Sequence, residues 1–202
     1  SIDVADSDPN IIYVGTGSDG IRSNVIIGRG LYKSTDAGKT WEMKGLRDMG
    51  QLGSVVVHPT NPEVVYVAAL GSPFGDNPER GVYKTTDGGA TWKQMLFVSA
   101  KTGAVDIELS PDNSDIVYAA MWRAERKPWT IISGDTGKED GIYVSRDGGE
   151  TWSKKSEGLP NDLIGKVDFA VSVADPSRVY ALVETDPKRE GLYRSNDHGE
   201  SW

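Results

Sequence analysis

The chain of 202 residues contains no cysteine. This absence excludes a disulfide framework, metal sites made of thiolates and a cysteine nucleophile. No apolar run approaches the roughly 20 residues that a membrane-spanning helix needs, so we expect no insertion into a membrane. Histidine occurs only at His58 and His198, which lie too far apart to match a common spacing of zinc ligands. We therefore expect no metal site.

Basic residues are scarce relative to acidic ones. The chain has 22 lysines and arginines against 30 aspartates and glutamates, which gives a formal net charge of -8. A nucleic-acid partner is disfavoured, because phosphate binding needs a basic surface. The 24 glycines and 10 prolines indicate many turns, which is typical of an all-β chain.

Alignment of the chain with itself reveals a repeat. Four segments share the pattern Gly-aliphatic-Tyr-x-[Ser/Thr]-x-Asp-x-Gly-x-[Thr/Ser]-Trp without a gap, and they occupy residues 30–41, 81–92, 141–152 and 191–202. We call the last eight positions of the pattern, from the Ser/Thr to the Trp, the box. Its aspartates and tryptophans are Asp36, Trp41, Asp87, Trp92, Asp147, Trp152, Asp197 and Trp202.

The residue types of the box favour a structural role for these aspartates and tryptophans. An Asp carboxylate can accept hydrogen bonds from backbone amides of its own turn. The Gly two residues later allows a positive φ, which a tight hairpin turn often needs. The Trp offers a large apolar face for packing.

A second signal precedes each box. A short apolar run of strand length surrounds each of four tyrosines, Tyr13, Tyr66, Tyr118 and Tyr180. Further upstream lie other strand-like runs, several of them alternating with period two. Each unit is therefore predicted to contain four antiparallel strands, the content of a propeller blade. We expect a single all-β β-propeller domain over residues 1–202, with blades at about 1–45, 54–96, 104–156 and 166–202.

These residues carry a family resemblance. The box resembles the Asp-box, or bacterial neuraminidase, repeat of sialidases, xyloglucanases and the sortilin luminal domain. Together with an Asp-Pro-x-x-(Val/Ile)-Tyr segment, as at 8–13, it looks most like bacterial sortilin-type, glycosyl-hydrolase-like propeller proteins. The resemblance implies rings of six or more blades. It also implies a secreted or periplasmic location.

Four blades are therefore expected to form an incomplete arc of a larger propeller. Such an arc would be completed by further blades or by self-association, because it leaves apolar blade faces uncovered.

The loop between the second and third predicted strands varies most in length and emerges opposite the box. Variable loops on a rigid scaffold usually carry binding. The candidate ligand-binding residues in these loops are Asp19, Arg22, Asn24, Asp76, Glu79, Arg80, Arg123, Arg126 and Trp129. Trp129 follows Pro128 in mid-loop and is the better aromatic candidate, whereas Trp122 is expected to continue the second strand into the core.

Three functions remain open from the sequence. The first hypothesis is an extracytoplasmic binding module that presents these loops to a glycan or peptide. The alternative is a glycoside hydrolase of sialidase or xyloglucanase type, of which this chain is a fragment, and it requires two carboxyl groups flanking a glycosidic bond. Its candidates are Asp19, Asp76, Glu79, Glu125 and Asp140, which nothing in the sequence pairs, so no catalytic residue is assigned. The third is a structural assembly module.

No cofactor is expected either. The glycines at 15, 17 and 20 match the spacing of a dinucleotide-binding fingerprint. That fingerprint needs a helix N-terminus to hold the pyrophosphate, and the residues that follow lead into another strand instead.

Overall fold

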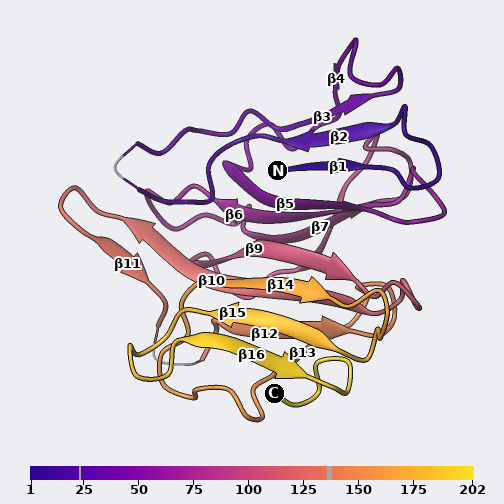
Figure 1. Ribbon diagram of the computed structural model, residues 1–202. Coiled ribbons are helices and arrows are strands. Elements are labelled where there is room, and N and C mark those ends of the chain that lie inside the picture. The colour runs from indigo at the N-terminus through magenta and orange to yellow at the C-terminus, as the bar shows by residue number, and fades with distance from the viewer. Residues whose placement is uncertain (23, 136–137) are drawn as a thin grey trace.

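The computed structural model describes residues 1–22, 24–135 and 138–202. Within these residues the chain forms sixteen strands and no helix. The strands form four sheets that follow one another in chain order, from the indigo sheet at the N-terminus to the yellow one at the C-terminus (Figure 1). We call them blades 1 to 4. The predicted all-β fold is confirmed.

Each blade is built from neighbours in sequence that pair antiparallel. Blade 1 contains β1 (Ile2–Val4), β2 (Ile12–Gly15), β3 (Leu31–Ser34) and β4 (Glu42–Met43). Blade 2 contains β5 (Gln51–Val57), β6 (Val65–Gly71), β7 (Gly81–Thr85) and β8 (Lys93–Leu96). Blade 3 contains β9 (Thr102–Leu109), β10 (Val117–Arg126), β12 (Gly141–Ser145) and β13 (Ser153–Lys155), with β11 (Ile131–Ser133) paired to the far end of β10. Blade 4 contains, within the described residues, β14 (Val167–Val171), β15 (Val179–Val183) and β16 (Gly191–Ser195).

The hydrophobic core lies between the blades. Three clusters of buried side chains occupy the junctions of blades 1 and 2, 2 and 3, and 3 and 4. The second-strand tyrosines are part of them: Tyr13, Tyr66 and Tyr118 are each at most 1% exposed. Trp122 is 5% exposed in the third junction, so the expectation that it continues β10 into the core is confirmed. Each blade therefore depends on its neighbour to bury its faces.

The first strands of the blades converge. β1 contacts β5, β5 contacts β9, and β9 contacts β14. Two ends of the assembly can then be distinguished. The loop face carries the connections between second and third strands, and the box face carries the box turns, because one strand separates the two kinds of connection.

The box turn is held by the same hydrogen bonds in every blade. In blade 3, Ser145 Oγ donates to Asp147 Oδ1 over 2.8 Å, and the same carboxylate oxygen accepts the amide of Thr151 at 2.8 Å. Ser145 Oγ also accepts the amide of Gly149. That glycine has φ 93°, in the left-handed region that a side chain rarely adopts. The turn thus satisfies its own polar groups.

These bonds depend on an ionised carboxylate. Hydrogen bonds from the Thr151 hydroxyl and amide, and from Ser145, hold the pKa of Asp147 at about 2. The pKa values of Asp36, Asp87 and Asp197 are likewise lowered to about 2 by hydroxyl and amide donors of their own boxes. The resulting stabilisation is present above the ordinary value of 3.8 and is lost as pH falls through about 2.

Replacing Ser145 by alanine is expected to lower the free energy of unfolding by roughly 1 to 3 kcal/mol. The side chain is fully buried, so the change leaves the amide of Gly149 without its acceptor. Urea denaturation of the wild type and the variant measures the difference. A Ser156→Ala variant, at an exposed position, serves as the control, and equal stability of all three proteins would contradict the structural role of the box.

Among the described residues, no helix is long and apolar enough to cross a membrane.

Candidate functional site

A cavity of about 500 Å³ opens on the loop face. It is lined by residues from the second-to-third-strand loops of three consecutive blades, namely Asn24, Val25, Phe74, Arg126, Lys127 and Pro128. Two of the sequence candidates, Asn24 and Arg126, are therefore brought together from blades 1 and 3. The lining combines apolar surface with two cationic side chains and an amide.

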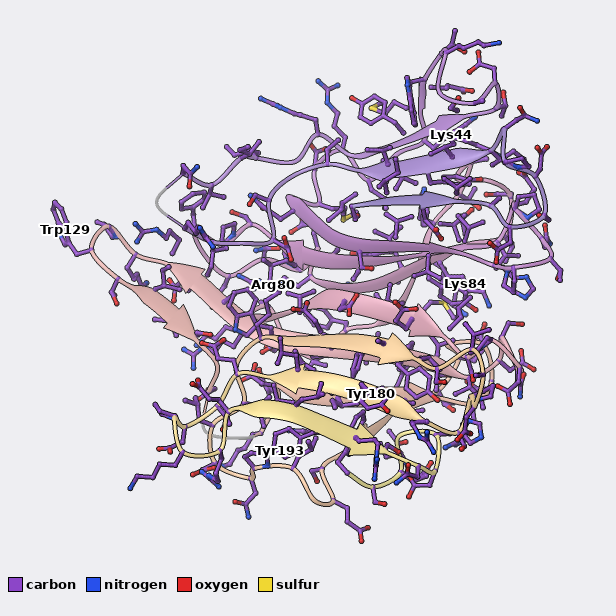
Figure 2. The ribbon with its side chains drawn as sticks, viewed as in Figure 1. Lys44, Arg80, Lys84, Trp129, Tyr180 and Tyr193 are labelled. Carbon is purple, nitrogen blue, oxygen red and sulfur yellow. The ribbon has the colours of Figure 1, made fainter. Side chains whose placement is uncertain are left out.

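The hairpin of β10 and β11 carries Trp129, which directly follows the lining residue Pro128. Arg126 pairs with Ile131 at the end of the hairpin, and the amide of Lys127 donates to the carbonyl of Thr130 across its turn. Trp129, in that turn, is 96% exposed, and its ring projects away from the blades (Figure 2). The amide of Arg126 also donates to the carbonyl of Pro73, which ties the hairpin to the loop of blade 2. An indole this exposed on an anchored hairpin is poised for stacking.

Arg126 itself fixes the geometry of the site. Its guanidinium donates to the carbonyls of Arg22, at 3.2 Å, and Thr130, at 2.9 Å, so it joins the loop of blade 1 to the hairpin. Beside it, Lys127 forms an ion pair with Glu125. That pair, with the Lys127 hydrogen bond as the main cause, lowers the pKa of Glu125. Glu125 is thus an ionised partner of a lysine and is poorly suited to act as a general acid.

Arg80 lies beneath the site instead of at its surface. Its side chain is 1% exposed, and Nη2 donates to the carbonyls of Ser72 and Ala124, at 2.9 and 3.1 Å (Figure 2). Burial lowers its pKa, which the nearby charges of Asp76 and Glu125 oppose. The guanidinium supports the 72–77 loop that carries Phe74, and it does not face a ligand directly.

The other candidates are dispersed over the loop face. Asp19 forms an ion pair with Lys166 of blade 4 at 2.7 Å, and Arg123 forms one with Asp135 at 2.6 Å. Arg22 and Asp76 are exposed, and Glu79 is half-buried. None of these lies on the lining of the 500 Å³ cavity.

Asp140 is buried in blade 3. Its carboxylate accepts the backbone amides of Arg123 and Asp135, and burial raises its pKa to about 6. These bonds hold the base of the hairpin. Its oxygens are thus used within the protein, which argues against a role as one of a pair of carboxyl groups on a sugar.

A second cavity, of about 330 Å³, lies on the box face where the first strands converge. Asp3, Asp6 and Glu108 contribute its carboxyl groups. Burial, followed by the charges of Asp106 and Asp3, raises the pKa of Glu108 to about 7. The sequence analysis missed this group. The feature of the sequence that could have indicated Glu108 is the alternation of acidic and apolar residues along 105–109, which puts Asp106 and Glu108 on one side of β9.

A serine–histidine pair also occurs on the box face. His58 Nε2 lies 2.7 Å from Ser114 Oγ, while His58 Nδ1 accepts the amide of Thr60. Because Nδ1 accepts a hydrogen bond, the ring proton is on Nε2, which donates a hydrogen bond to Ser114 Oγ. The imidazole therefore cannot deprotonate Ser114 in this arrangement. Within residues 1–22, 24–135 and 138–202, no group of three or more His, Asp or Glu side chains could hold a metal ion.

Comparison with known proteins identifies the repeat. A family model for the BNR/Asp-box repeat matches residues 32–43 and 143–154, in blades 1 and 3. The chain carries Asp-box repeats. The Asp boxes of blades 2 and 4 follow the same pattern and form the same hydrogen bonds.

The curated relatives of this Asp-box chain are xyloglucanases. A xyloglucanase from Acetivibrio thermocellus is 29% identical over 175 residues, which cover 78% of this chain and 19% of the relative. One from a Paenibacillus species is 28% identical over 165 residues, covering 72% of this chain and 15% of the relative. A probable oligoxyloglucan-reducing end-specific xyloglucanase from Neosartorya fischeri is 26% identical over 181 residues, covering 86% of this chain and 19% of the relative. The chain thus spans less than a fifth of the length of these relatives.

Two solved structures resemble the Asp-box fold over the whole chain. An ancestral GH74 enzyme superposes with a TM-score of 0.72 at 19% identity, over 100% of this chain and 23% of that one. The GH74 xyloglucanase from Xanthomonas campestris superposes with a TM-score of 0.68 at 16% identity, over 100% of this chain and 29% of that one. At such identities the likeness shows the fold alone. The four sheets are blades of a β-propeller, as predicted.

Proposed function

We propose that this chain is part of a carbohydrate-acting protein and binds a polysaccharide on its loop face. The observation that carries the proposal is the cavity of about 500 Å³ whose lining includes the exposed Phe74 and ends at Pro128, directly before the exposed Trp129 in the chain. Its preferred ligand class is a β-glucan chain of the xyloglucan type, because the curated relatives are xyloglucanases.

The chemistry of the loop face suits a sugar. Phe74 is 56% exposed on the cavity wall, and Trp129, one residue after Pro128 of that wall, is 96% exposed, so the loop face offers two aromatic planes for the apolar faces of sugar rings. Asn24 and Lys127 supply hydrogen-bond donors for hydroxyl groups on the same wall. Pro128 stiffens the turn that carries Trp129, which lowers the entropy lost on binding.

Replacing Trp129 by alanine is expected to weaken binding of a xyloglucan oligosaccharide at least about tenfold, which corresponds to ~1.4 kcal/mol. The reason is the loss of the stacking surface, since the ring is too exposed to contribute to folding. Isothermal titration calorimetry with the oligosaccharide measures the change. Met43→Ala, which removes another exposed apolar side chain from outer strand β4, serves as the control and should bind like the wild type.

Two outcomes would contradict the proposal. In the first, the wild type fails to bind xyloglucan, mannan and arabinoxylan oligosaccharides alike. In the second, the wild type binds, and Trp129→Ala and Phe74→Ala bind with unchanged affinity. Capture of a peptide at the same cavity, weakened by the same two substitutions, would support instead the peptide-binding function that the sortilin-type resemblance implies.

A second candidate function, glycoside hydrolysis, is favoured by Glu108. Its pKa of about 7 leaves it partly protonated at neutral pH on the wall of the second cavity, the state that a general acid requires. Release of reducing sugar from xyloglucan by the wild type, and its loss in Glu108→Gln, would support hydrolysis. Binding of xyloglucan without release of reducing sugar would support the binding function and contradict hydrolysis.

The location follows from the same proposal. Polysaccharides of this class are substrates outside the cell membrane, so we place the protein in a secreted or periplasmic compartment. Tracking of the tagged full-length protein in culture fractions tests this.

A further inference from the structure

The loop between β2 and β3 of blade 1 reaches beyond its own blade. It occupies residues 16–30, and blade 2 holds its base: the amide of Leu52 donates to the carbonyl of Thr16 at 3.1 Å, and Gln51 Nε2 donates to the carbonyl of Ile26 at 3.3 Å. We call its described residues 18–22 the latch segment. This segment contacts blades 3 and 4 through two side chains and one carbonyl, which are taken in turn below.

The first contact of the latch segment is apolar. Ile21 is only 3% exposed although it lies in a loop. It belongs to the buried cluster at the junction of blades 3 and 4, together with Trp122 of β10 and Ile164, which precedes β14. Leu70 of β6 is part of the same cluster. Because burial of an isoleucine side chain is strongly favourable, Ile21 anchors the blade 1 loop to the other three blades.

The second contact is an ion pair with blade 4. Asp19 Oδ2 lies 2.7 Å from Lys166 Nζ, and the two side chains are 35% and 29% exposed. The same ammonium lies 3.4 Å from Oδ1 of Asp168 on β14, which keeps the lysine on its own blade. A pair that is partly withdrawn from water is screened less by salt than an exposed one. Asp19 therefore ties the latch segment to a blade that lies 147 positions further along the chain.

The third contact joins the latch segment to blade 3. The carbonyl of Arg22 accepts a hydrogen bond from Arg126 Nε at 3.2 Å. Asn24 and Val25, which come shortly after Arg22 in the sequence, form the blade 1 part of the lining of the 500 Å³ cavity. The contacts with blades 3 and 4 thus come directly before the cavity wall that blade 1 supplies.

We propose that Asp19 and Ile21 are positioning residues of this cavity, which hold Asn24 and Val25 in the arrangement that binds the polysaccharide. Neither Asp19 nor Ile21 is among the lining residues, so each acts on the ligand through the loop. The inference rests on the proposed function of the cavity. If either contact is lost, the loop samples other positions, and the apparent Kd rises by the inverse of the fraction of molecules that keep the binding arrangement.

Isothermal titration calorimetry with a xyloglucan oligosaccharide tests the effect on binding. Ile21→Ala is expected to weaken binding at least about fivefold, because the anchor of the loop is lost. Asp19→Asn should weaken it about threefold, in the range of a partly exposed ion pair. The control is Asp162→Asn, which breaks an ion pair with Arg189 between residues outside the latch segment and should bind like the wild type. Affinities of Ile21→Ala and Asp19→Asn equal to that of the wild type would overturn the proposal.

A double-mutant cycle shows whether Asp19 acts through Lys166. Lys166→Met should weaken binding about as much as Asp19→Asn, because each removes the same ion pair. The variant with both substitutions should then bind like either single variant. A general loss of stability would not produce this equality. Losses that multiply in the double variant would show that the two side chains act separately, which would overturn the role of the ion pair.

Hydrogen exchange followed by NMR tests the anchoring of the loop without a ligand. The amides of Ser18 and Arg22 are hydrogen-bonded within the loop, so their exchange requires local opening. In Ile21→Ala and Asp19→Asn these two amides should exchange at least about threefold faster than in the wild type. The amide of Gly149, held by Ser145 Oγ in the box of blade 3, should keep its rate and so exclude global unfolding.

The two experiments separate this proposal from the proposed function. Unchanged exchange of the Ser18 and Arg22 amides would overturn the anchoring, whether or not the wild type binds the oligosaccharide. Faster exchange in a protein whose wild type binds no oligosaccharide would contradict the proposed function and still support the anchoring. Faster exchange together with weaker binding would support both.

Discussion

Replacement of Ile142 by alanine is expected to lower the free energy of unfolding by about 3 kcal/mol. Ile142 is fully buried in the junction between blades 3 and 4, where it packs with residues of both blades. Its truncation removes buried apolar surface and leaves a cavity that the β-sheet backbone on either side cannot readily close. A loss of this size would show that packing between blades contributes substantially to the stability of this fold.

The matched control is Leu192→Ala, at the same position of the repeat in blade 4. Because Leu192 is 69% exposed, this substitution is expected to change the free energy by less than about 0.5 kcal/mol. Urea denaturation followed by tryptophan fluorescence measures both values. Similar losses for the two variants would show that burial between blades is not what distinguishes them.

The second large effect is a change in the free energy of unfolding on Glu108→Gln, and its size is expected to depend on pH. Burial raises the pKa of Glu108 from its ordinary value of 4.5 to about 7. Between these two values the folded chain holds a proton that the unfolded chain has released, so stability falls as pH rises. The full shift corresponds to roughly 3 kcal/mol, lost between about pH 4.5 and pH 7. The variant, which has no charge to bury, should be more stable than the wild type at pH 8 by up to this amount.

Denaturation curves at pH 5 and pH 8 measure this dependence. The stability difference between Glu108→Gln and the wild type should be larger at pH 8 than at pH 5. Glu157→Gln removes an exposed carboxylate and serves as the control, with little change expected at either pH. If the stability difference between the variant and the wild type is the same at pH 5 and pH 8, Glu108 ionises as readily in the folded chain as in the unfolded one.

The two candidate functions occupy opposite ends of the molecule. The cavity beside Trp129 lies on the loop face, and the cavity beside Glu108 lies on the box face. Because the two cavities share no lining residue, binding and hydrolysis can be tested by separate substitutions. Phe74→Ala changes only the lining of the first cavity, and Glu108→Gln only that of the second.

The sequence by itself determined the strands, their order and the box turns. These features repeat every 50 to 60 residues and depend on local chemistry, such as the Ser145–Asp147 hydrogen bond and the positive φ of Gly149. The sequence also indicated the loops that line the 500 Å³ cavity, because the spacing between the second-strand tyrosine and the next box varies more than the rest of the repeat. It did not show that Arg80 is buried or that residues 131–133 form a hairpin with β10.

Only the tertiary structure decided which side chains meet. The pKa of Glu108 is raised by burial among the converging first strands, and Arg80 is covered by its own loop and by β10 of the next blade. Both environments come from residues that lie far apart in the sequence and come together only when successive blades pack. A repeat pattern specifies each blade through its nearest residues, whereas burial and charge at a site depend on neighbours that the pattern does not contain.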